Sequence, residues 1–284
     1  MSTVDKEKEL EFLRIWQSER LQEYRNNGFD FQSGPKDVTV LSYFYRSNAD
    51  IVESFSYLEC AIYETWRHCG IMKTVIVTNE NSSSVKEFAD KWVDAVEIQV
   101  EPNLVPGSLD PMSIDCNSKL YQRFNTKYVL IVQDDGFPLR SGLEKFLGKW
   151  DFLGSPMRRN VPLVNLVGIF KRHWPSNGGF SLRTKKMCRL VAEYWNKYYA
   201  DKPFDEATGI EDLFYTKTLQ DRFLSFRWRV NVGNASIASK FAYDACLGNG
   251  INFHSDVFGF HSARAFAELI RKNDRLGVRC IGAS

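Results

Sequence analysis

The stretch KYVLIVQDDG, residues 127–136, decides how the rest of the chain is interpreted. It begins with a run of β-branched, aromatic and other apolar residues of strand length. Such a run is typical of a strand that is buried on both faces, as in a parallel sheet. Two adjacent acids, Asp134 and Asp135, follow it directly. We therefore expect a buried strand that carries two carboxylates at its carboxyl end.

Strand-like and helix-like segments alternate upstream of this stretch. Strands are predicted over residues 38–45, 73–78 and 95–100, and helices over residues 50–67, 84–92 and 114–124. Strands alternating with helices indicate βαβ units and a mainly parallel sheet flanked by helices. Ligands of such sheets bind at the carboxyl ends of the strands, which is where the two acids lie.

The N-terminal segment differs from the rest in its charge. Residues 1–26 carry Leu10, Leu13 and Leu21 near helical spacing, which predicts a charged helix. We expect a helical extension over residues 1–35 and a single domain over residues 36–284. The extension either packs on the outside of the domain or mediates assembly, as a homo-oligomer contact or a contact to another partner.

The second half of the chain is less regular. Its polar and glycine-rich segments are DFLGSP (151–156), SNGGFSLR (176–183), GIEDLF (209–214) and VFGFH (257–261). Helices are expected over about residues 184–199, from residue 211, and near the end to about residue 272.

Composition excludes several classes of protein. The 284 residues carry a formal net charge of +2 with both signs mixed, which does not indicate a nucleic-acid-binding protein. No apolar run approaches the roughly 18 residues of a membrane span, and the N-terminus lacks a signal-peptide pattern. The 6 cysteines show no CxxC spacing, so we expect reduced thiols and no zinc site. The expected location is the cytoplasm, either free or held at the inner face of the membrane by a partner.

The two acids after the central strand allow two interpretations. Asp and Gly are common in turns, so the sequence DDG is by itself compatible with a polar turn. Alternatively, carboxylates at the end of a buried strand can bind a hard divalent cation. Such a cation would neutralise the charge of a diphosphate leaving group. We predict that Asp135, helped by Asp134 or His261, binds Mn²⁺ or Mg²⁺.

Two further segments carry candidate site residues. Asn177, Gly178 and Gly179 form either an ordinary loop before a helix or a backbone that approaches a ligand closely. Glu211 and Asp212 open a predicted helix, where acids act as caps or, alternatively, as a general base toward a hydroxyl.

Two more positions depend on their surroundings. His261 lies in an apolar segment, where a lone histidine is either a satisfied core residue or a metal ligand. Tyr45 and Arg46 follow the first predicted strand and should lie at the same sheet edge as Asp135. They could contact the base and a phosphate of a nucleotide; alternatively, Arg46 caps the next helix or lies in solvent.

Taken in order, these segments resemble a bacterial and fungal glycosyltransferase-like family that is catalogued as a domain of unknown function, DUF5672. Typical members read QTD, DYIGAPW, GNGGLSLR, ED and FGFH in the same order, and the resemblance covers roughly residues 38–265. The matching positions are Gln133, Asp135, Asn177, Gly178, Gly179, Glu211, Asp212 and His261. Asp134 stands where the family has Thr, Met157 where it has Trp and Ser176 where it has Gly.

The resemblance implies an α/β fold of the GT-A-like (Rossmann-like) type: a mainly parallel sheet flanked by helices, here with an N-terminal helix. It implies a metal-dependent glycosyltransferase that moves a sugar from a nucleotide-sugar donor to a hydroxyl of a glycan or lipid-linked glycan. A UDP-sugar is the favoured donor, inversion the preferred outcome and bacterial surface polysaccharide synthesis the expected role. A retaining enzyme would carry the same metal turn.

Carried over by position, the resemblance also implies roles for single residues. Gln133, Asp134 and the loop at residues 177–179 would bind the donor. Asp212 would be the general base, with Glu211 positioning the hydroxyls of the acceptor.

Two rival functions follow from the same residues. A non-catalytic module that binds nucleotide sugars or glycans would need no base, so the combination of Asp135, Glu211, Asp212 and His261 argues against it. A metal-dependent phosphotransferase or hydrolase would need a nucleophile or a paired-metal cluster, and the sequence shows neither pattern.

Overall fold

The computed structural model describes residues 3–28, 33–45, 51–79, 83–105, 110–158, 173–175, 178–204, 209–220, 226–244 and 256–272. The helices are α1 (Thr3–Asn27), α2 (Ile51–Cys69), α3 (Ser83–Lys91), α4 (Asp110–Lys119), α5 (Lys185–Tyr198), α7 (Glu211–Gln220), α9 (Ala235–Phe241) and α10 (Ala263–Lys272), with short 3-10 turns η1 (Leu120–Gln122) and η2 (Leu143–Lys145). The strands are β1 (Val38–Phe44), β2 (Thr74–Thr78), β3 (Val96–Val100), β4 (Tyr128–Ile131), β5 (Phe152–Gly154), β6 (Pro156–Arg158), β7 (His173–Pro175), β8 (Ser181–Thr184), β9 (Ala242–Asp244) and β10 (Gly259–His261).

The main sheet has 6 strands in the order β3-β2-β1-β4-β8-β5. Strands β3, β2, β1 and β4 are parallel to one another, whereas β8 runs antiparallel to both β4 and β5. The chain builds outward from β1 to β3 and then returns to β4 on the other side of β1. A ligand crevice of such a sheet is expected at this switch, beside the carboxyl ends of β1 and β4.

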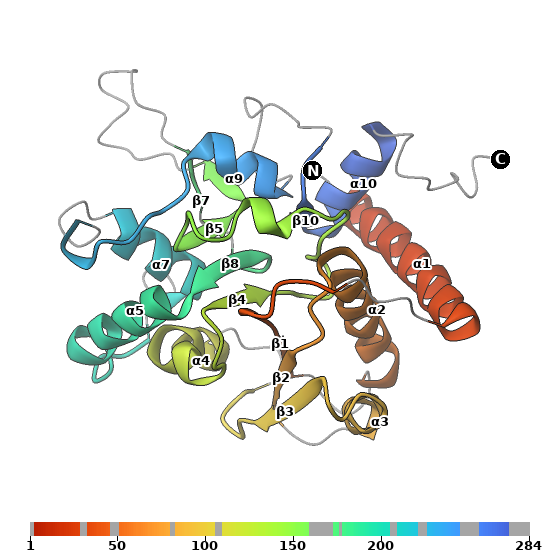
Figure 1. Ribbon diagram of the computed structural model, residues 1–284, viewed down its shortest axis with the longest axis horizontal. Coiled ribbons are helices and arrows are strands. Elements are labelled where there is room, and N and C mark those ends of the chain that lie inside the picture. The colour runs from red at the N-terminus through yellow and green to blue at the C-terminus, as the bar shows by residue number, and fades with distance from the viewer. Residues whose placement is uncertain are drawn as a thin grey trace.

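Each face of the sheet is covered by helices because successive strand residues point to opposite sides. Val40 and Leu130 lie in one buried cluster with side chains of α1, α9 and α10. Leu41 and Ile131 lie in another with side chains of α4, α5 and α7. Figure 1 shows this separation, with α1, α2 and α10 on one side and α4 and α5 on the other. The α/β fold predicted from the sequence, a mainly parallel sheet flanked by helices, is thereby confirmed.

The N-terminal helix packs against α2 and α10 of the main domain. Leu13 and Gln17 are fully buried, and Trp16 stacks on Phe137 with ring centroids 6.0 Å apart. Phe137 follows the acidic turn after β4, so α1 lies directly against the segment that carries the predicted site.

Two small sheets accompany the main one, β9 with β10 in parallel and β6 with β7 in antiparallel pairing. Four cysteines of the described chain, Cys60, Cys69, Cys116 and Cys188, are buried free thiols. Among the described residues, no helix has the length and apolar character that crossing a membrane requires.

Candidate functional site

The acidic turn after β4 is a tight reversal with its own pair of backbone hydrogen bonds. The amide of Gln133 donates to the carbonyl of Gly136 at 3.0 Å, and the amide of Gly136 donates back at 3.1 Å. The amide of Ser262 then donates to the carbonyl of Asp135 at 2.8 Å. These bonds fix Asp134 and Asp135 at the tip of the turn and tie the tip to the end of β10.

The two acids of this tip are held by different elements. Asp134 bonds to α1: its Oδ2 accepts from Arg14 at 2.6 Å, and its carbonyl accepts from the Gln17 side chain at 2.6 Å. Asp135 instead faces β10, with its Oδ1 3.7 Å from Nε2 of His261. The turn therefore presents one carboxylate to the N-terminal helix and the other to His261.

His261 lies between two carboxylates from different parts of the chain. Its Nδ1 is 3.5 Å from Oδ2 of Asp244, and its Nε2 is 3.2 Å from Oε1 of Gln133. The pairing of β9 with β10 places Asp244 opposite His261, and Asp244 is buried. Ser155, from the DFLGSP segment, lies 3.5 Å from the same carboxylate. Asp244 thus orients the imidazole toward the acidic turn.

Burial and charge act in opposite directions on the pKa of His261. Burial lowers it, but the negative charges of Asp135 and Asp244 raise it more, and Glu211 adds to this effect. The pKa of Asp135 is raised, mainly by burial and also by Asp134, while His261 and Arg14 oppose the rise. The imidazole of His261 is therefore influenced electrostatically by Asp135, Asp244 and Glu211.

The glycine loop before β8 presses against this cluster. A Cβ atom at Gly179 would lie 2.1 Å from Nε2 of His261 and 2.5 Å from Oε1 of Gln133, so a side chain does not fit there. The carbonyl of Gly178 accepts a hydrogen bond from Ser181 at 2.9 Å. The loop is therefore a wall of the site. Asn177, the third predicted donor-binding residue of this loop, lies outside the described residues.

The second acidic pair begins α7, and its first member is tied to a buried arginine. Glu211 forms an ion pair with Arg183 of β8, and the two side chains are 9% and 1% exposed. The Arg183 guanidinium also lies 4.4 Å from the ring centroid of Tyr215. Its Nη1 is buried without a hydrogen-bond partner among the described residues. The side chain of Asp212 lies outside the described part of α7.

The predicted contacts at the end of β1 are placed in part. Tyr45 is half-buried, and its hydroxyl donates to the sulfur of Met112 at 3.3 Å. It packs against the cluster beneath α4 and α5. Arg46 lies outside the described residues.

The residues around Asp135 fit a metal ion that is shared with a ligand. In the described ranges, no group of three or more His, Cys, Asp and Glu side chains could hold a metal ion by itself. Asp135 and His261 could supply two ligand side chains, and the amide oxygen of Gln133 lies beside them. Mg²⁺ in nucleotide sites is commonly held by one or two carboxylates together with substrate phosphates. Asp135, His261 and Gln133 therefore fit a cation whose remaining ligands come from a bound phosphate. They do not fit a cation that is held by protein side chains alone.

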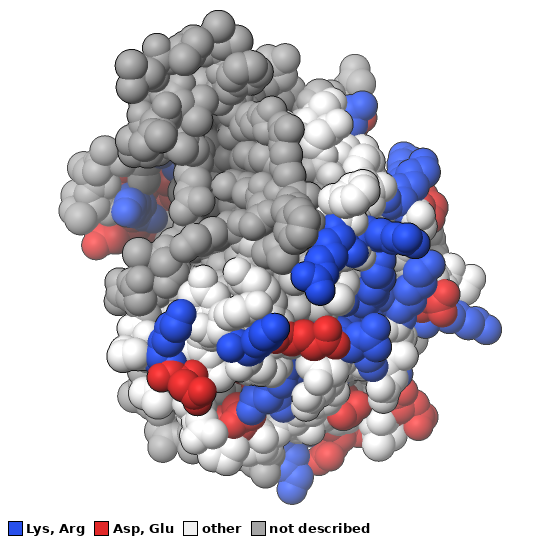
Figure 2. Space-filling view, turned by 90° about the vertical axis from the view of Figure 1, so that its left-hand side faces the viewer, with Lys and Arg blue, Asp and Glu red and all other residues white. Residues whose placement is uncertain are grey.

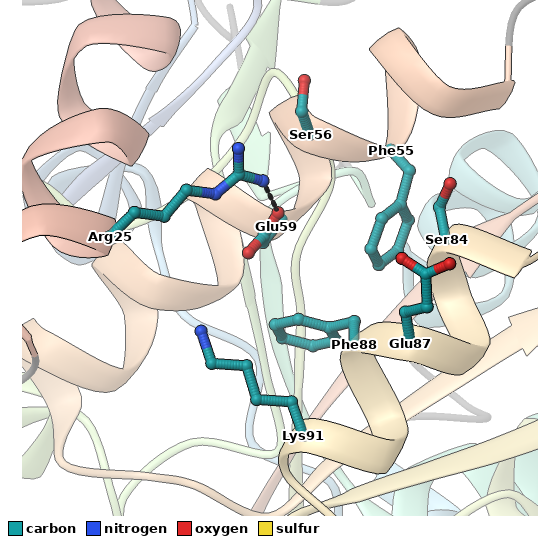
Figure 3. Close-up of a pocket in the computed structure, with 8 residues that line it drawn as sticks. All are labelled: Arg25, Phe55, Ser56, Glu59, Ser84, Glu87, Phe88 and Lys91. Atoms are coloured by element: carbon teal, nitrogen blue, oxygen red, sulfur yellow. Dashed lines mark hydrogen bonds and ion pairs between the residues drawn. The ribbon is translucent and has the colours of Figure 1, made fainter.

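A separate pocket of about 270 Å³ lies between α1, α2 and α3 (Figure 3). Arg25 reaches over it from α1 and pairs with Glu59 at 2.7 Å, and Lys91 points into it from α3. Phe55 and Phe88 form its floor, but both rings are buried. None of the predicted site residues lines this pocket.

The outer face near α5 carries charges of both signs. Figure 2 shows Lys and Arg side chains there with Asp and Glu side chains between them. Arg189 and Glu193 of α5, for example, form an exposed ion pair at 3.7 Å. The described part of this face has no continuous basic surface of the kind that binds nucleic acid.

Sequence reasoning did not identify Arg14, Gln17 or Asp244 as site residues. Arg14 and Gln17 approach the turn from more than a hundred positions away along the chain, and Asp244 ends a strand of 3 residues. No local pattern marks such contacts. Arg183, in contrast, ends the segment NGGFSLR and could have been singled out with it.

Comparison with known proteins gave a family model and a set of solved structures. The model of the family described as "Protein of unknown function (DUF5672)" matches residues 101–261, more than half of the chain. No curated protein matches the sequence.

Three of the similar solved structures illustrate the low sequence identity of these matches. A mannosyltransferase from Pyrobaculum calidifontis in complex with GDP-Man and Mn²⁺ is 16% identical over 72% of this chain and 58% of its own, with a TM-score of 0.38. The mannosyltransferase Ktr4p from S. cerevisiae is 13% identical over 72% of each chain, also with a TM-score of 0.38. TarS from S. aureus in complex with UDP-GlcNAc is 16% identical over 63% of this chain and 52% of its own, with a TM-score of 0.35. This chain thus spans less than two thirds of the first and third of these.

Proposed function

The chain belongs to the DUF5672 family, and we propose that it is a metal-dependent glycosyltransferase that uses a nucleotide-sugar donor. The observation that carries this proposal is the cluster of Asp135, His261 and Gln133 at the carboxyl end of β4, closed on one side by Gly179. The cluster lies at the edge of the sheet where ligands of parallel α/β folds bind.

The chain's own residues suit the binding of a diphosphate with a divalent cation. Asp135 and His261 would hold Mn²⁺ or Mg²⁺, which when bound would offset the charge that develops on the departing diphosphate. Asp244 would keep the His261 ring oriented, as a carboxylate behind a metal-binding histidine commonly does. Gly179 would leave room for the donor close to the backbone.

Two acids at the start of α7 would serve the acceptor. On a helix, adjacent side chains point about 100° apart, so Glu211 and Asp212 cannot both face the same acceptor atom. Glu211 is held in the buried pair with Arg183. We therefore assign the general base to Asp212, which would take the proton from the acceptor hydroxyl as that oxygen attacks the anomeric carbon.

The finer parts of the proposal concern the reaction partners. We further propose a UDP-sugar donor and inversion at the anomeric carbon. The family resemblance supports a glycan or lipid-linked glycan acceptor and a role in bacterial surface polysaccharide synthesis. Donor contacts of Tyr45, Arg46 and Asn177 and a cytoplasmic location belong to the same proposal.

The deciding assay incubates the full chain with UDP-, GDP- and CMP-sugars, each with Mn²⁺ and with EDTA. We expect hydrolysis or transfer with one donor class in Mn²⁺, loss in EDTA and recovery when Mn²⁺ is returned. Saturable donor binding without turnover would instead identify a binding module. Full activity in EDTA would leave the Asp134-Asp135 segment as a polar turn and remove the metal from the proposal.

A further inference from the structure

The N-terminal helix contacts the acidic turn at its tip, although it lies outside the residues that the family model matches. Arg14 donates to the Asp134 carboxylate at 2.6 Å and to Oε1 of Gln17 at 2.9 Å. Gln17 in turn donates to the Asp134 carbonyl at 2.6 Å and to the Tyr57 carbonyl at 3.3 Å. One residue of the turn is thus bound through both its side chain and its backbone.

This contact is built to be rigid. Gln17 is fully buried, so its amide is committed to these bonds. The central carbon of the Arg14 guanidinium lies over the ring of Tyr57 on α2, 4.1 Å from the ring centroid. The side chains of Arg14 and Asp134 are 18% and 21% exposed, which limits screening of their charges by solvent. Charge-assisted hydrogen bonds of this length are among the stronger polar contacts in proteins.

The contact also places a positive charge beside two adjacent acids. A second carboxylate beside Asp135 would repel the phosphates of a nucleotide. Arg14 supplies the positive charge that offsets Asp134.

We propose that Arg14 and Gln17 are positioning residues of the site: they hold and neutralise Asp134 on α1, so that Asp135 is the acid of the turn that meets the metal and the nucleotide. This inference rests on the proposed function for its ligand. It assigns α1 to the site and the metal-binding role to Asp135 rather than Asp134.

The first test measures binding of UDP in the presence of Mn²⁺ by calorimetry. Arg14→Gln should raise the Kd about tenfold, the size of one charge-assisted contact. Adding Asp134→Thr to Arg14→Gln should restore part of the lost affinity, because the second substitution removes the carboxylate that Arg14 neutralises. Asp135→Asn should abolish binding.

The matched control is Arg20→Gln, on the same helix. Arg20 pairs with Glu64 at 2.8 Å and touches no residue of the turn. This variant should lower the melting temperature and leave the Kd unchanged. Equal effects of Arg14→Gln and Arg20→Gln on the Kd would show that α1 acts only through overall stability, and weaker binding in Arg14→Gln/Asp134→Thr than in Arg14→Gln would make Asp134 the metal ligand. Either result overturns the inference.

A second measurement does not depend on the ligand. Amide hydrogen exchange of the peptide covering residues 130–137 should accelerate in Arg14→Gln and stay unchanged in Arg20→Gln, because the turn loses its anchor in the first variant. If the wild type binds no nucleotide, the proposed function fails, while the exchange result still decides whether Arg14 holds the turn. Unchanged exchange in Arg14→Gln would contradict the positioning role.

Discussion

Two pairs of adjacent acids, Asp134-Asp135 and Glu211-Asp212, are organised in the same way at different depths. In each pair, one acid forms an ion pair with an arginine from a distant element. Asp134 meets Arg14 at the rim, with side chains 18% and 21% exposed on the arginine and the acid, whereas Glu211 meets Arg183 in the interior, with side chains 9% and 1% exposed on the acid and the arginine. The difference indicates that the inner pair is part of the folded core and the outer pair adjusts a surface turn.

The depth of a pair decides what its removal does. Removing one partner of a buried ion pair leaves the other charge buried without water or a counter-charge. This lowers the free energy of unfolding far more than removing one partner of an exposed pair. We propose that the other acid of each pair, Asp135 and Asp212, is the one that takes part in the chemistry.

Asp212→Asn should lower kcat by about 10²–10⁴-fold, because a general base contributes rate enhancement of this size. Glu211→Gln keeps the shape of its side chain and is the matched control. We expect it to lower the stability of the protein and to reduce kcat less than Asp212→Asn does. Donor affinity, measured for both variants, should remain near that of the wild type for Asp212→Asn. A fully active Asp212→Asn enzyme together with an inactive but folded Glu211→Gln enzyme would exchange the two roles.

Arg183→Met should reduce the free energy of unfolding by about 3–5 kcal/mol, the usual cost of removing one partner of a buried ion pair. Urea denaturation provides the measurement. The double variant Arg183→Met/Glu211→Leu should regain much of this loss, since Nη1 of Arg183 is buried without a partner among the described residues and apolar packing removes that penalty. A double variant less stable than either single variant would show that the pair contributes net stability.

Gly179→Ala should cost about 1–3 kcal/mol of stability, because its Cβ would have to displace His261 and Gln133. It should also weaken binding of UDP with Mn²⁺, since the displaced imidazole leaves Asp135. Gly148→Ala is the control: its φ of +78° strains any side chain, but no atom lies within 4 Å of the added Cβ. That control should lose stability without losing nucleotide affinity, and an equal loss of affinity in both variants would contradict the close-packed wall.

The fold was accessible from the sequence where contacts are local or periodic. The predicted strands over residues 38–45, 73–78 and 95–100 correspond to β1, β2 and β3, because β-branched runs between helical segments have few alternatives. The helix predicted over residues 50–67 is α2 (Ile51–Cys69), whose Phe55, Leu58 and Ile62 are buried as the spacing requires. These predictions are confirmed.

The antiparallel part of the fold was not predicted from local pattern. Strand β8 has 4 residues and β5 has 3, too few for a period to be recognised. Their position beside β4 depends on pairing across long sequence separations, which no window of the sequence contains. The segments SNGGFSLR and DFLGSP were therefore not predicted to contain strands, although each contributes one.

The sequence identified several residues of the candidate site but not the contacts between them. The structure brings Gln133, Asp135, Gly179 and His261 together, as the order of the motifs suggested, and their chemical roles stay predictions. The partners that orient them, Arg14 and Asp244, come from elements whose docking depends on the whole core. Such partners follow from tertiary structure, so a single sequence does not reveal them.

A third cluster of charges lies away from the predicted site residues. It shows how much a partly exposed ion pair contributes to stability when it has no role in the site. Glu101 accepts hydrogen bonds from Lys119 at 2.6 Å and from Arg123 at 2.7 Å. The bond from Lys119 lowers the pKa of Glu101 most, burial opposes this, and Arg123 lowers it further, to about 2 from an ordinary value of 4.5. The carboxylate form is therefore favoured by folding.

The sign of the pH effect follows from this lowered pKa. A group with a lower pKa in the folded state stabilises the protein above its unfolded pKa and loses that contribution as pH falls through its folded pKa. Glu101→Gln should therefore cost about 1 kcal/mol at neutral pH, the smallest effect predicted here, since its partners are partly exposed. Between about pH 5 and pH 2, the unfolding free energy of this variant should decline less steeply than that of the wild type.

Glu97→Gln, at an exposed position of β3, is the control and should follow the wild-type curve. Parallel curves for Glu101→Gln and the wild type would show that the Lys119 and Arg123 contacts contribute nothing in solution. A shallow rim pair such as Arg14–Asp134 would then also be expected to act on the turn through position and not through stability.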